Sequence, residues 1–342
     1  MVSKLEEGSS SSKRRRRDDD YAKQSTCRPR RKQHLYLALD DWNGGVAGGW
    51  PMAFAALGTN IFIATNPRSQ GDRAPPTLVY DTNTSALTVG PRVPNNIRDL
   101  NDAMAAGETL YALTSVPYPE YSSLHALSWA PTDIPDPEPW DPAMEWSWNT
   151  APSPRPPPCD GIDVIAYALH PDGRTVFVST GFSTHSLDAG SGVWKDLGDW
   201  VLPFRGQAFF DADLDAWVGL HHTYYGYICC CPVASRGTAA TRAPECRMLM
   251  EKLFRRKEED PKHRSLLRGK EITLTYMGDS RFALVENILR TDDYNDGSVL
   301  HITLFGLKYD HKGELQTKVR RATRSYAVSK NNPMFSHAAF WM

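Results

Sequence analysis

The sequence predicts an all-β fold in which small four-stranded sheets repeat around a ring, the arrangement of a β-propeller. Three observations lead to this prediction. Residues Val164–Asp199 show four strand-like runs, degenerate copies of that pattern recur along the chain, and a strand-like run lies near each end of the propeller region. A four-stranded sheet is too small to be stable alone, so such sheets bury their apolar faces by stacking on like neighbours.

The pattern is clearest in Val164–Asp199. The β-rich runs IAYAL, TVFVST, THSLD and VWKDLGDW are separated by HPDGR, by Gly181 and by AGSG. Asp-Gly and Gly-Ser-Gly between β-rich runs are strong hairpin signals. This stretch therefore predicts an antiparallel meander of four strands.

Five copies of an inner hairpin follow the same pattern, each with an aromatic residue in its second run. The copies are Phe54–Ala64, Ala103–Leu113, Ala166–Ser179, Ala208–Leu220 and Leu274–Glu286. Their aromatic residues are Phe62, Tyr111, Phe177, Trp217 and Phe282. These lie about 40 to 66 residues apart, the length of one four-stranded blade plus loops. A second hairpin is predicted after each copy, in TLVYDTNTSALTVGP, LHALSWAP, HSLDAGSGVWKDL, YICCCPVA and ITLFGLKYDHKGEL.

The two ends of the propeller region are predicted to meet. HLYLALDDW at His34–Trp42 reads as a strand, but the Gly-rich Asn43–Gly49 follows where a hairpin partner is expected. Phe335–Met342 is a short aromatic strand that can complete the same blade, which removes an open sheet edge. Residues 34–342 are thus expected to form one domain of five four-stranded blades plus a reduced sixth blade closed by both termini. A five-bladed ring is the alternative.

Composition limits the classes of protein to consider. The chain has 342 residues, of which 41% are hydrophobic, enough for a packed core. No run approaches 18 apolar residues and residues 1–33 lack an apolar stretch, so we expect no membrane partner and no secretory signal. The cysteines show no paired spacing, which favours a reduced intracellular compartment. They are Cys27, Cys159, Cys229, Cys230, Cys231 and Cys246.

Residues 1–33 form a basic tail. They carry eleven Lys/Arg and five Asp/Glu, a balance of +6, so a net charge of −1 leaves −7 on the remainder. Their low apolar content predicts disorder. Two basic clusters ten residues apart resemble a bipartite nuclear localisation signal bound by an import receptor, which predicts a nuclear protein, with the cytoplasm as alternative. A solvated tail and a non-specific nucleic-acid arm are the other interpretations. The candidate signal residues are Lys13, Arg14, Arg15, Arg16, Arg17, Arg28, Arg30, Arg31 and Lys32.

Two segments depart from the repeat. The Pro-rich stretch Ser147–Gly161 predicts a long loop, with a PxxP ligand as the alternative. Residues 236–270 contain CRMLMEKLFRRKEED, which predicts an outer strand followed by a helical insertion, or a basic loop. This stretch is expected to present a solvated face, and the sharper alternative is a contact with an acidic partner or RNA. Its basic residues are Arg247, Lys252, Arg255, Arg256 and Lys257.

No motif predicts catalysis, a cofactor or a metal. His221–His222 precede Cys229–Cys231, but adjacent strand residues point to opposite faces, so three consecutive cysteines cannot reach one ion. They read as buried small hydrophobic residues. The DADLDA stretch has Ala216 where a calcium loop needs glycine, so it reads as a hairpin turn whose carboxylates accept from turn amides. Its carboxylates are Asp211, Asp213 and Asp215. Nucleophile-elbow, P-loop and dinucleotide motifs do not occur.

The motifs together resemble a kelch-like β-propeller family of plants, found in grasses and of unknown function. The resemblance covers nearly all of residues 13–342 and rests on the basic tail, HLYLALDDW, FAALGTNIF, LVYDTNT, VGPRVP, LHALSW and EKLF with YMGDSRFALVE. Its most specific block is Ala166–Leu220, with YALHPDGRTVFVS and GVWKDLGDWVLPFRGQAFFDADLDAWVGL. The resemblance implies a kelch-type ring and a plant source but no activity. The chain has no LPxxL-type box, so the ubiquitin-ligase adaptor role of related F-box kelch proteins does not carry over.

The sequence therefore predicts a non-catalytic protein-interaction scaffold whose loops form a binding face for a protein partner. One alternative is a small-molecule enzyme with its site in the propeller channel, which would need ionisable side chains from several blades to converge there. The other is a nucleic-acid-associated protein that binds through the tail and the basic stretch, with strong salt dependence.

Overall fold

The computed structural model describes most of the predicted ring. The described residues are 2–5, 32–40, 52–64, 75–94, 97, 100, 103–113, 124–131, 143–150, 164–224, 226–235, 243–255, 272–289, 298–329 and 335–342. They contain strands, turns and irregular segments and no α-helix, which confirms the all-β class. In this part of the chain no helix is long and apolar enough to cross a membrane.

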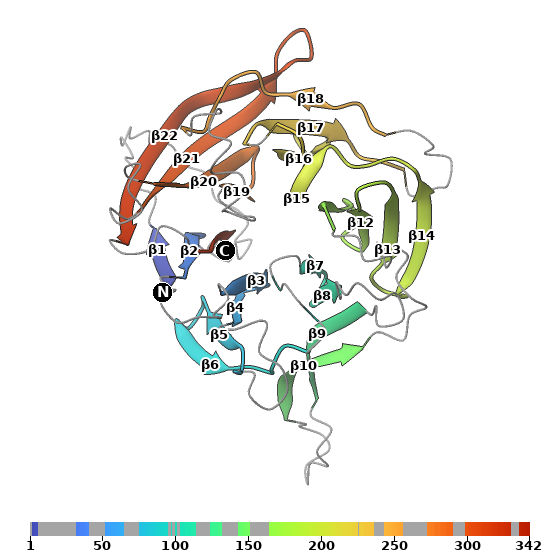
Figure 1. The fold of residues 1–342 in the computed structure, drawn as a ribbon, viewed down its shortest axis with the longest axis vertical. Helices are drawn as coiled ribbons and strands as arrows, with labels where there is room; N and C mark the ends of the chain where they lie inside the picture. The colour runs from blue at the N-terminus through green and yellow to red at the C-terminus, as the bar shows by residue number, and fades with distance from the viewer. Residues whose placement is uncertain are drawn as a thin grey trace, which may run out of the picture.

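Consecutive strands form antiparallel meanders, each with its first strand innermost in Figure 1. The first meander comprises β3 (Ala53–Leu57), β4 (Asn60–Ala64), β5 (Leu78–Asp81) and β6 (Ala86–Val89). The second comprises β7 (Met104–Ala106), β8 (Thr109–Leu113), β9 (Leu124–Pro131) and β10 (Met144–Thr150). The last comprises β19 (Ile272–Tyr276), β20 (Arg281–Leu289), β21 (Ser298–Tyr309) and β22 (Leu315–Ser329). The chain is a β-propeller, and the number of its blades stays a prediction.

The third and fourth meanders join into one eight-stranded sheet. The third, predicted from Val164–Asp199, comprises β11 (Ala166–Leu169), β12 (Thr175–Ser179), β13 (Thr184–Asp188) and β14 (Val193–Gly198). The fourth comprises β15 (Phe204–Asp211), β16 (Ala216–His221), β17 (Ile228–Pro232) and β18 (Arg247–Met248). The innermost strands β11 and β15 pair in parallel, with Ala166 opposite Gly206 and Ala168 opposite Ala208. The sequence did not predict this parallel pairing.

A three-stranded sheet joins the two ends of the propeller region, as predicted. Its order is β1 (Val2–Leu5), β2 (Leu35–Leu39) and β23 (His337–Trp341), all antiparallel. Leu35 lies opposite Trp341, and Leu39 lies opposite His337. β1 lies within residues 1–33, the tail for which the sequence predicts disorder. Val2–Leu5 pairs with the free edge of β2, which offers this short segment a ladder of hydrogen bonds.

The five predicted aromatic residues all lie on the second strand of a meander. Phe62, Phe177, Trp217 and Phe282 are 0% exposed and Tyr111 is 8% exposed. Burying a side chain of this size contributes on the order of 2–3 kcal/mol. Phe177 and Trp217 contact each other edge-on across neighbouring meanders, at 5.0 Å between ring centroids. The indole of Trp217 also donates to the Leu169 carbonyl at 2.9 Å, so its polar atom is satisfied.

Three sequence predictions differ from the structure in detail. LHALSWAP and the first residues of YICCCPVA each contribute one strand, β9 and β17, rather than a hairpin. Their partners β10 and β18 come after longer connections, because neither stretch contains a Gly or Asn turn signal. Ser147–Thr150 belongs to β10, so the predicted Pro-rich loop is shorter than expected, and its PxxP stretch lies outside the described residues.

Candidate functional site

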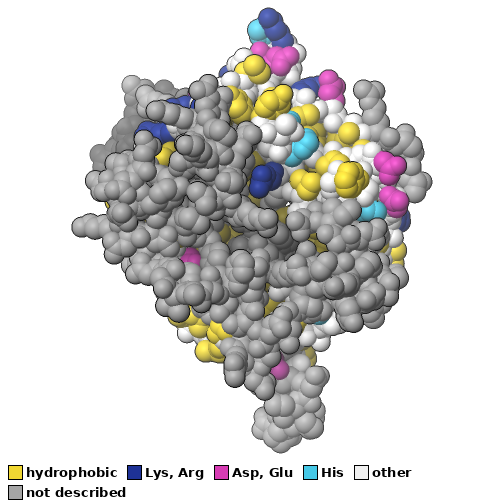
Figure 2. All heavy atoms as spheres, viewed as in Figure 1, with side chains coloured by type: hydrophobic (Ala, Val, Ile, Leu, Met, Phe, Trp, Pro, Cys, Tyr) yellow, Lys and Arg dark blue, Asp and Glu magenta, His cyan; other side chains and the backbone are white. Residues whose placement is uncertain are grey.

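Three connections lie at the same end of the third and fourth meanders. Because β11 and β15 run parallel, the turns that follow them leave at one end, and the β12–β13 and β16–β17 connections lie at the opposite end. The β14–β15 connection also reaches this opposite end, since β14 leads back to it. We call this end of the molecule the connection face. Figure 2 shows hydrophobic and histidine side chains exposed over the β12–β18 sector.

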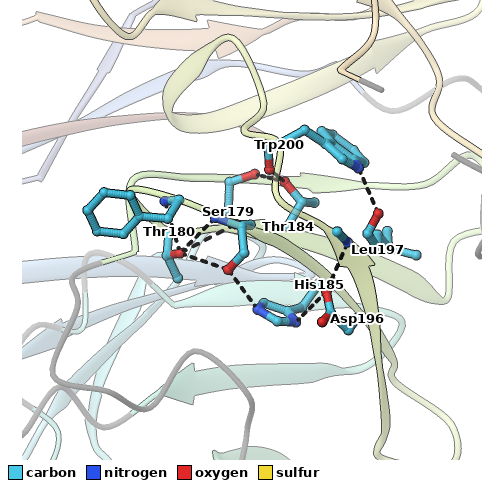
Figure 3. A network of polar contacts seen from close by, with 10 residues as sticks. Ser179, Thr180, Thr184, His185, Asp196, Leu197 and Trp200 are labelled. Carbon is cyan, nitrogen blue, oxygen red and sulfur yellow. Dashed lines mark hydrogen bonds and ion pairs between the residues drawn. The ribbon is translucent and has the colours of Figure 1, made fainter. Parts of the chain in front are cut away.

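Buried hydroxyl groups hold the β14–β15 connection in place (Figure 3). Ser179 and Thr184 form a hydroxyl–hydroxyl hydrogen bond of 2.7 Å across β12 and β13. The Thr184 hydroxyl donates to the Trp200 carbonyl at 2.6 Å, and the Leu202 amide donates to the Ser179 hydroxyl at 3.0 Å. The indole of Trp200 donates to the Leu197 carbonyl at 2.8 Å. Buried hydrogen bonds of this kind fix one conformation, so the β14–β15 connection is held rigidly.

Beside this network lie three side chains in sequence, those of Ser183, His185 and Asp196. Ser183 Oγ lies 3.0 Å from His185 Nε2, while His185 Nδ1 lies 3.8 Å from Asp196 Oδ1. Burial lowers the pKa of His185, and the charge of Asp196 acts in the opposite direction. The second distance is too long for a hydrogen bond, so the carboxylate does not orient the imidazole as a nucleophile–base pair requires. The three side chains therefore resemble a catalytic triad in residue types but not in geometry.

The β16–β17 connection carries a stack of rings. His221 and His222 stack at 5.0 Å, and Tyr224 lies 5.1 Å from His221 on a tilted plane. The amides of Thr223 and Tyr224 donate to His221 Nδ1 at 3.0 and 3.1 Å. Burial lowers the pKa of His221, and the neighbouring His222 acts in the same direction. His221 is thus a neutral ring that accepts at Nδ1 and anchors this turn.

Two large side chains project from these connections into solvent. Phe182 of the β12–β13 connection is 73% exposed, and Tyr224 of the β16–β17 connection is 57% exposed. Exposed His222 and Thr223 adjoin Tyr224. We call Phe182, His222, Thr223 and Tyr224 the Phe182–Tyr224 surface. Exposed aromatic residues on a rigid base mark sites of protein contact more often than isolated aliphatic ones do.

The predicted cysteine run behaves as its alternation indicated. Cys229 and Cys231 pack in the cluster that contains Phe204 and Trp217, whereas Cys230 packs in the opposite cluster with Phe282. All three cysteines are 0% exposed. Within the described ranges, no group of three His, Cys, Asp or Glu side chains could hold a metal ion. Cys27 and Cys159 lie outside those ranges.

The DADLDA stretch is the turn between β15 and β16, as predicted. Asp211 accepts from the Leu214 amide at 2.9 Å. It also accepts from the next meander, where the Ser280 amide and hydroxyl lie 2.9 and 2.8 Å away. Asp213 makes a longer 3.3 Å contact with the same hydroxyl, and Asp215 has a positive φ of 47°. Asp211 thus joins two meanders, which the sequence did not predict.

The predicted basic residues are only partly described. Arg247 donates to the Gly313 carbonyl at 3.2 Å and lies over the Tyr309 ring, and Lys252 lies over Phe254. The Arg255 amide donates to Glu286 at 2.9 Å. Residues 243–255 contain the two-residue strand β18 and no helix, and the remainder of 236–270, with Arg256 and Lys257, lies outside the described residues.

Of the candidate localisation signal, only Lys32 is described, and it is exposed. Residues 13–17, 28, 30 and 31 lie outside the described residues. The structure therefore leaves the signal as a sequence prediction.

The sequence did not predict the Phe182–Tyr224 surface. Phe182 follows the break at Gly181, and Tyr224 follows the His221–His222 pair that was weighed only as a metal site. An isolated aromatic residue between two turn signals was the available clue. Phe182 and Tyr224 lie at the same end of the eight-stranded sheet only because β11 and β15 pair in parallel.

Comparisons with known proteins identify a family. Solved structures that match most of the chain include the major allergen Mala s 1 of Malassezia sympodialis, at 11% identity, with 80% of this chain and 79% of that chain covered and a TM-score of 0.40. Kluyveromyces lactis Hsv2 is 12% identical, with 79% and 73% covered and a TM-score of 0.35. The β-propeller domain of Myceliophteria thermophila Cps50 (Swd1) is 10% identical, with 79% and 71% covered and a TM-score of 0.34.

No curated protein matches the chain significantly. Residues 3–326, however, match a family described as "Protein of unknown function (DUF1668)". This match extends over β1 to most of β22, and so includes the strand that precedes the basic clusters. The chain therefore belongs to the DUF1668 family of proteins of unknown function.

Proposed function

We propose that the chain is a non-catalytic scaffold that binds a protein partner through the Phe182–Tyr224 surface. The observation that carries this proposal is the exposure of Phe182 and Tyr224, 73% and 57%, in turns whose amides donate to Thr180 and to His221. Binding to a rigid surface costs less conformational entropy than ordering a loop, so two fixed aromatic rings can act as anchors. Aromatic side chains are enriched at such contacts because each buries a large area.

The innermost strands support a scaffold rather than a channel enzyme. Their described ionisable side chains are Tyr167, Arg205, Asp211, Tyr276 and His337. Asp211 accepts hydrogen bonds from Leu214 and Ser280, the Tyr167 hydroxyl donates to the Ala103 carbonyl, and His337 is buried. Burial, followed by the bond to Asp211, raises the pKa of Tyr276 to about 12. Tyr167, Asp211, Tyr276 and His337 thus bond to protein atoms or lie buried, which favours structural roles over a shared reaction centre.

A matched pair of double variants tests the binding surface. Phe182→Ser with Tyr224→Ser removes the proposed anchors, while Leu87→Ser with Val89→Ser removes two residues of β6 with similar exposure, 58% and 72%. Each protein is fused to a proximity-labelling enzyme, and the labelled partners are compared with those of the unchanged chain. We expect the labelling of specific partners to fall at least tenfold in the first variant and to stay unchanged in the second. Equal labelling by the first variant and the unchanged chain would contradict the proposal.

We also propose that the partner is met in the nucleus, with an import receptor bound to the basic clusters. Neutral Gln at Lys13–Arg17 and at Arg28–Lys32 removes the charge and keeps β1, which a deletion of the tail would remove. A fluorescent fusion of this variant is expected to move to the cytoplasm. If it stays nuclear, the nuclear part of the proposal is wrong while the scaffold part stands.

Two finer assignments remain proposals. The repeated motifs support a kelch-type ring and a plant source, as the family resemblance implies.

The nucleic-acid alternative is tested by measuring how the binding of nucleic acid to the unchanged chain depends on salt concentration. A steep loss of affinity with salt that also requires Arg247 and Lys252 would favour it, because counterion release gives that signature.

A further inference from the structure

Three thiols gather on one face of the fourth meander. Cys229 and Cys231 are two residues apart on β17 and therefore point to the same side, where they pack with Phe204 and Trp217. Cys246, just before β18, packs against this cluster and is only partly buried. Cys230 points to the opposite side, where its thiol lies 3.4 Å from the Tyr309 hydroxyl. Cys246 is thus the partly exposed member of the same-face group.

The strand register brings Cys246 over the β17 cysteines. Cys229 lies opposite Met248 and Cys230 lies opposite Arg247, and the Leu249 amide donates to the Ile228 carbonyl at 2.9 Å. The next antiparallel step is Cys246 toward Cys231, with Cys229 on the diagonal. The side chain of Cys246 forms its hydrogen bond with Cys229. The two thiols in contact are therefore the diagonal pair, of which Cys246 is partly exposed and Cys229 is buried.

This contact distinguishes the two thiols chemically. The bond from Cys229 lowers the pKa of Cys246, although partial burial acts in the opposite direction. The same bond, and then burial, raises the pKa of Cys229, which keeps its proton. Burial raises the pKa of Cys230 and of Cys231. A partly exposed thiol with a lowered pKa beside a second thiol has the arrangement of an oxidation-sensitive pair.

We propose that Cys246 is a peroxide-sensitive thiol that forms a reversible disulfide with Cys229. The Cys246 thiolate attacks one oxygen of hydrogen peroxide, the O–O bond breaks, and a sulfenic acid and hydroxide result. The Cys229 sulfur then attacks the sulfenic sulfur, the S–OH bond breaks, and the Cys229 proton leaves with the hydroxyl group as water. Peroxide takes up the two electrons that the two thiols lose, and a dithiol reductant reverses the reaction.

The disulfide would fix a weakly paired outer segment. Strand β18 has only two residues, yet the chain after it inserts Leu249, Leu253 and Phe254 into the core shared by the fourth and last meanders. The Arg255 amide then reaches Glu286 of β20. A covalent bond at Cys246 would hold this segment on β17 at its start. Oxidation is therefore expected to raise the midpoint of thermal unfolding and to slow proteolysis after Cys246.

Peptide mapping tests the proposal on the full chain without any substitution. Reduced protein is treated with hydrogen peroxide, free thiols are blocked with iodoacetamide, and the digest is sequenced by tandem mass spectrometry. We expect a Cys229–Cys246 linked peptide that disappears after treatment with dithiothreitol. Oxidation of Cys246 to sulfinic acid without a link, or a link from Cys246 to any cysteine other than Cys229, would overturn the proposal.

Two variants add a control. Cys246→Ser removes the accessible thiol, and Cys230→Ala removes a neighbouring thiol on the opposite face. The peroxide-induced rise in unfolding temperature is expected to vanish in the first variant and to persist in the second. A rise that survives Cys246→Ser contradicts the proposal. If Cys230→Ala fails to fold, alkylation rates in the unchanged chain decide the point, since Cys246 must react at least tenfold faster than Cys230.

Discussion

Single buried polar side chains join neighbouring meanders at defined points. Asp211 accepts one bond from Leu214 of its own turn and two from Ser280 of the last meander. Thr275 of β19 donates to the Ala339 carbonyl of β23 at 2.9 Å. Hydrophobic stacking alone tolerates sliding of one sheet on another, whereas a hydrogen bond has a preferred direction. These residues therefore set how adjacent meanders align.

Replacing Asp211 with Asn tests this role. One oxygen can still accept, but the new NH2 group must face the Leu214 amide or the Ser280 groups, which leaves a buried donor unpaired. We expect a loss of about 2–3 kcal/mol in the free energy of unfolding, measured by urea denaturation. Asp213→Asn is the control, because Asp213 is exposed and makes one longer contact, and it should cost less than about 0.5 kcal/mol. Equal losses in the two variants would show that Asp211 has no special role.

His337 makes stability depend on pH. Its ring is fully buried beside Phe335, and this burial lowers its pKa to about 4, with the Val285 backbone acting in the opposite direction. The unfolded chain binds the proton below about pH 6.5 and the folded chain only below about pH 4, so stability is full above pH 6.5 and falls as the pH drops through this window. The expected loss from this residue is on the order of 3 kcal/mol.

Urea denaturation at several pH values checks this expectation. His337→Leu should unfold with a smaller dependence on pH between 6.5 and 4 than the unchanged chain. Phe335→Leu perturbs the neighbouring packing and keeps the imidazole, so it should lower stability at every pH and retain the dependence. If the free energy of unfolding of His337→Leu changed with pH as steeply as that of the unchanged chain, His337 would not be the source of the pH dependence.

Strand β23 closes the ring at the scale of an element. It pairs with β2 through five residue pairs and contacts β19 through Thr275, so it joins the closing sheet to the last meander. The Ser336 hydroxyl donates to the Met52 carbonyl and the Asp40 carboxylate accepts from the Met52 amide, which ties the same region to the first meander. β1, by contrast, adds only to the outer edge of β2.

Two truncations separate these roles. Removal of His337–Met342 opens the ring and exposes Leu35, Leu37 and Val285, so we expect loss of the folded monomer and aggregation. Removal of Val2–Leu5 uncovers one outer edge, and the chain should stay folded with a small fall in melting temperature. Size-exclusion chromatography and thermal unfolding distinguish the two results. A folded monomer after the first truncation would show that closure is not required.

At the scale of the whole molecule, every meander depends on its neighbours. The alternate cysteines of β17 illustrate this, because Cys229 and Cys230 enter different cores on opposite sides of one strand. The parallel β11–β15 pairing adds backbone hydrogen bonds between two meanders, including Gly206 N to Ile165 O at 2.7 Å. A meander cannot unfold without uncovering the core that it shares with the next one.

We therefore expect a single cooperative unfolding transition. The ten tryptophans of the chain include Trp129 and Trp148 of the second meander, Trp217 of the fourth and Trp341 of the closing sheet. Their fluorescence should change at the same urea concentration as the β-sheet circular dichroism of the whole chain. Separate midpoints for the two signals would indicate meanders that unfold independently, and would contradict a ring stabilised by shared cores.

The sequence by itself determined the meanders and the residues that face their cores. Alternating runs separated by Asp-Gly and Gly-Ser-Gly predicted Val164–Asp199 correctly, and the five aromatic residues all proved to be buried on second strands. Local turn chemistry and a period of two are properties of neighbouring residues, so they can be read from the chain. The pairing of β2 with β23 was also predictable, because each was a strand without a local partner.

Only the tertiary structure decided which distant residues share a surface. The Phe182–Tyr224 surface, the bonds from Asp211 to Ser280 and the contact of Cys246 with Cys229 each join segments that the sequence alone does not align. Their geometry depends on the parallel joining of β11 to β15 and on where long connections return, and neither has a local signal. Short-range chemistry specifies each sheet, whereas the packing of one sheet against another specifies the places where this protein can bind and react.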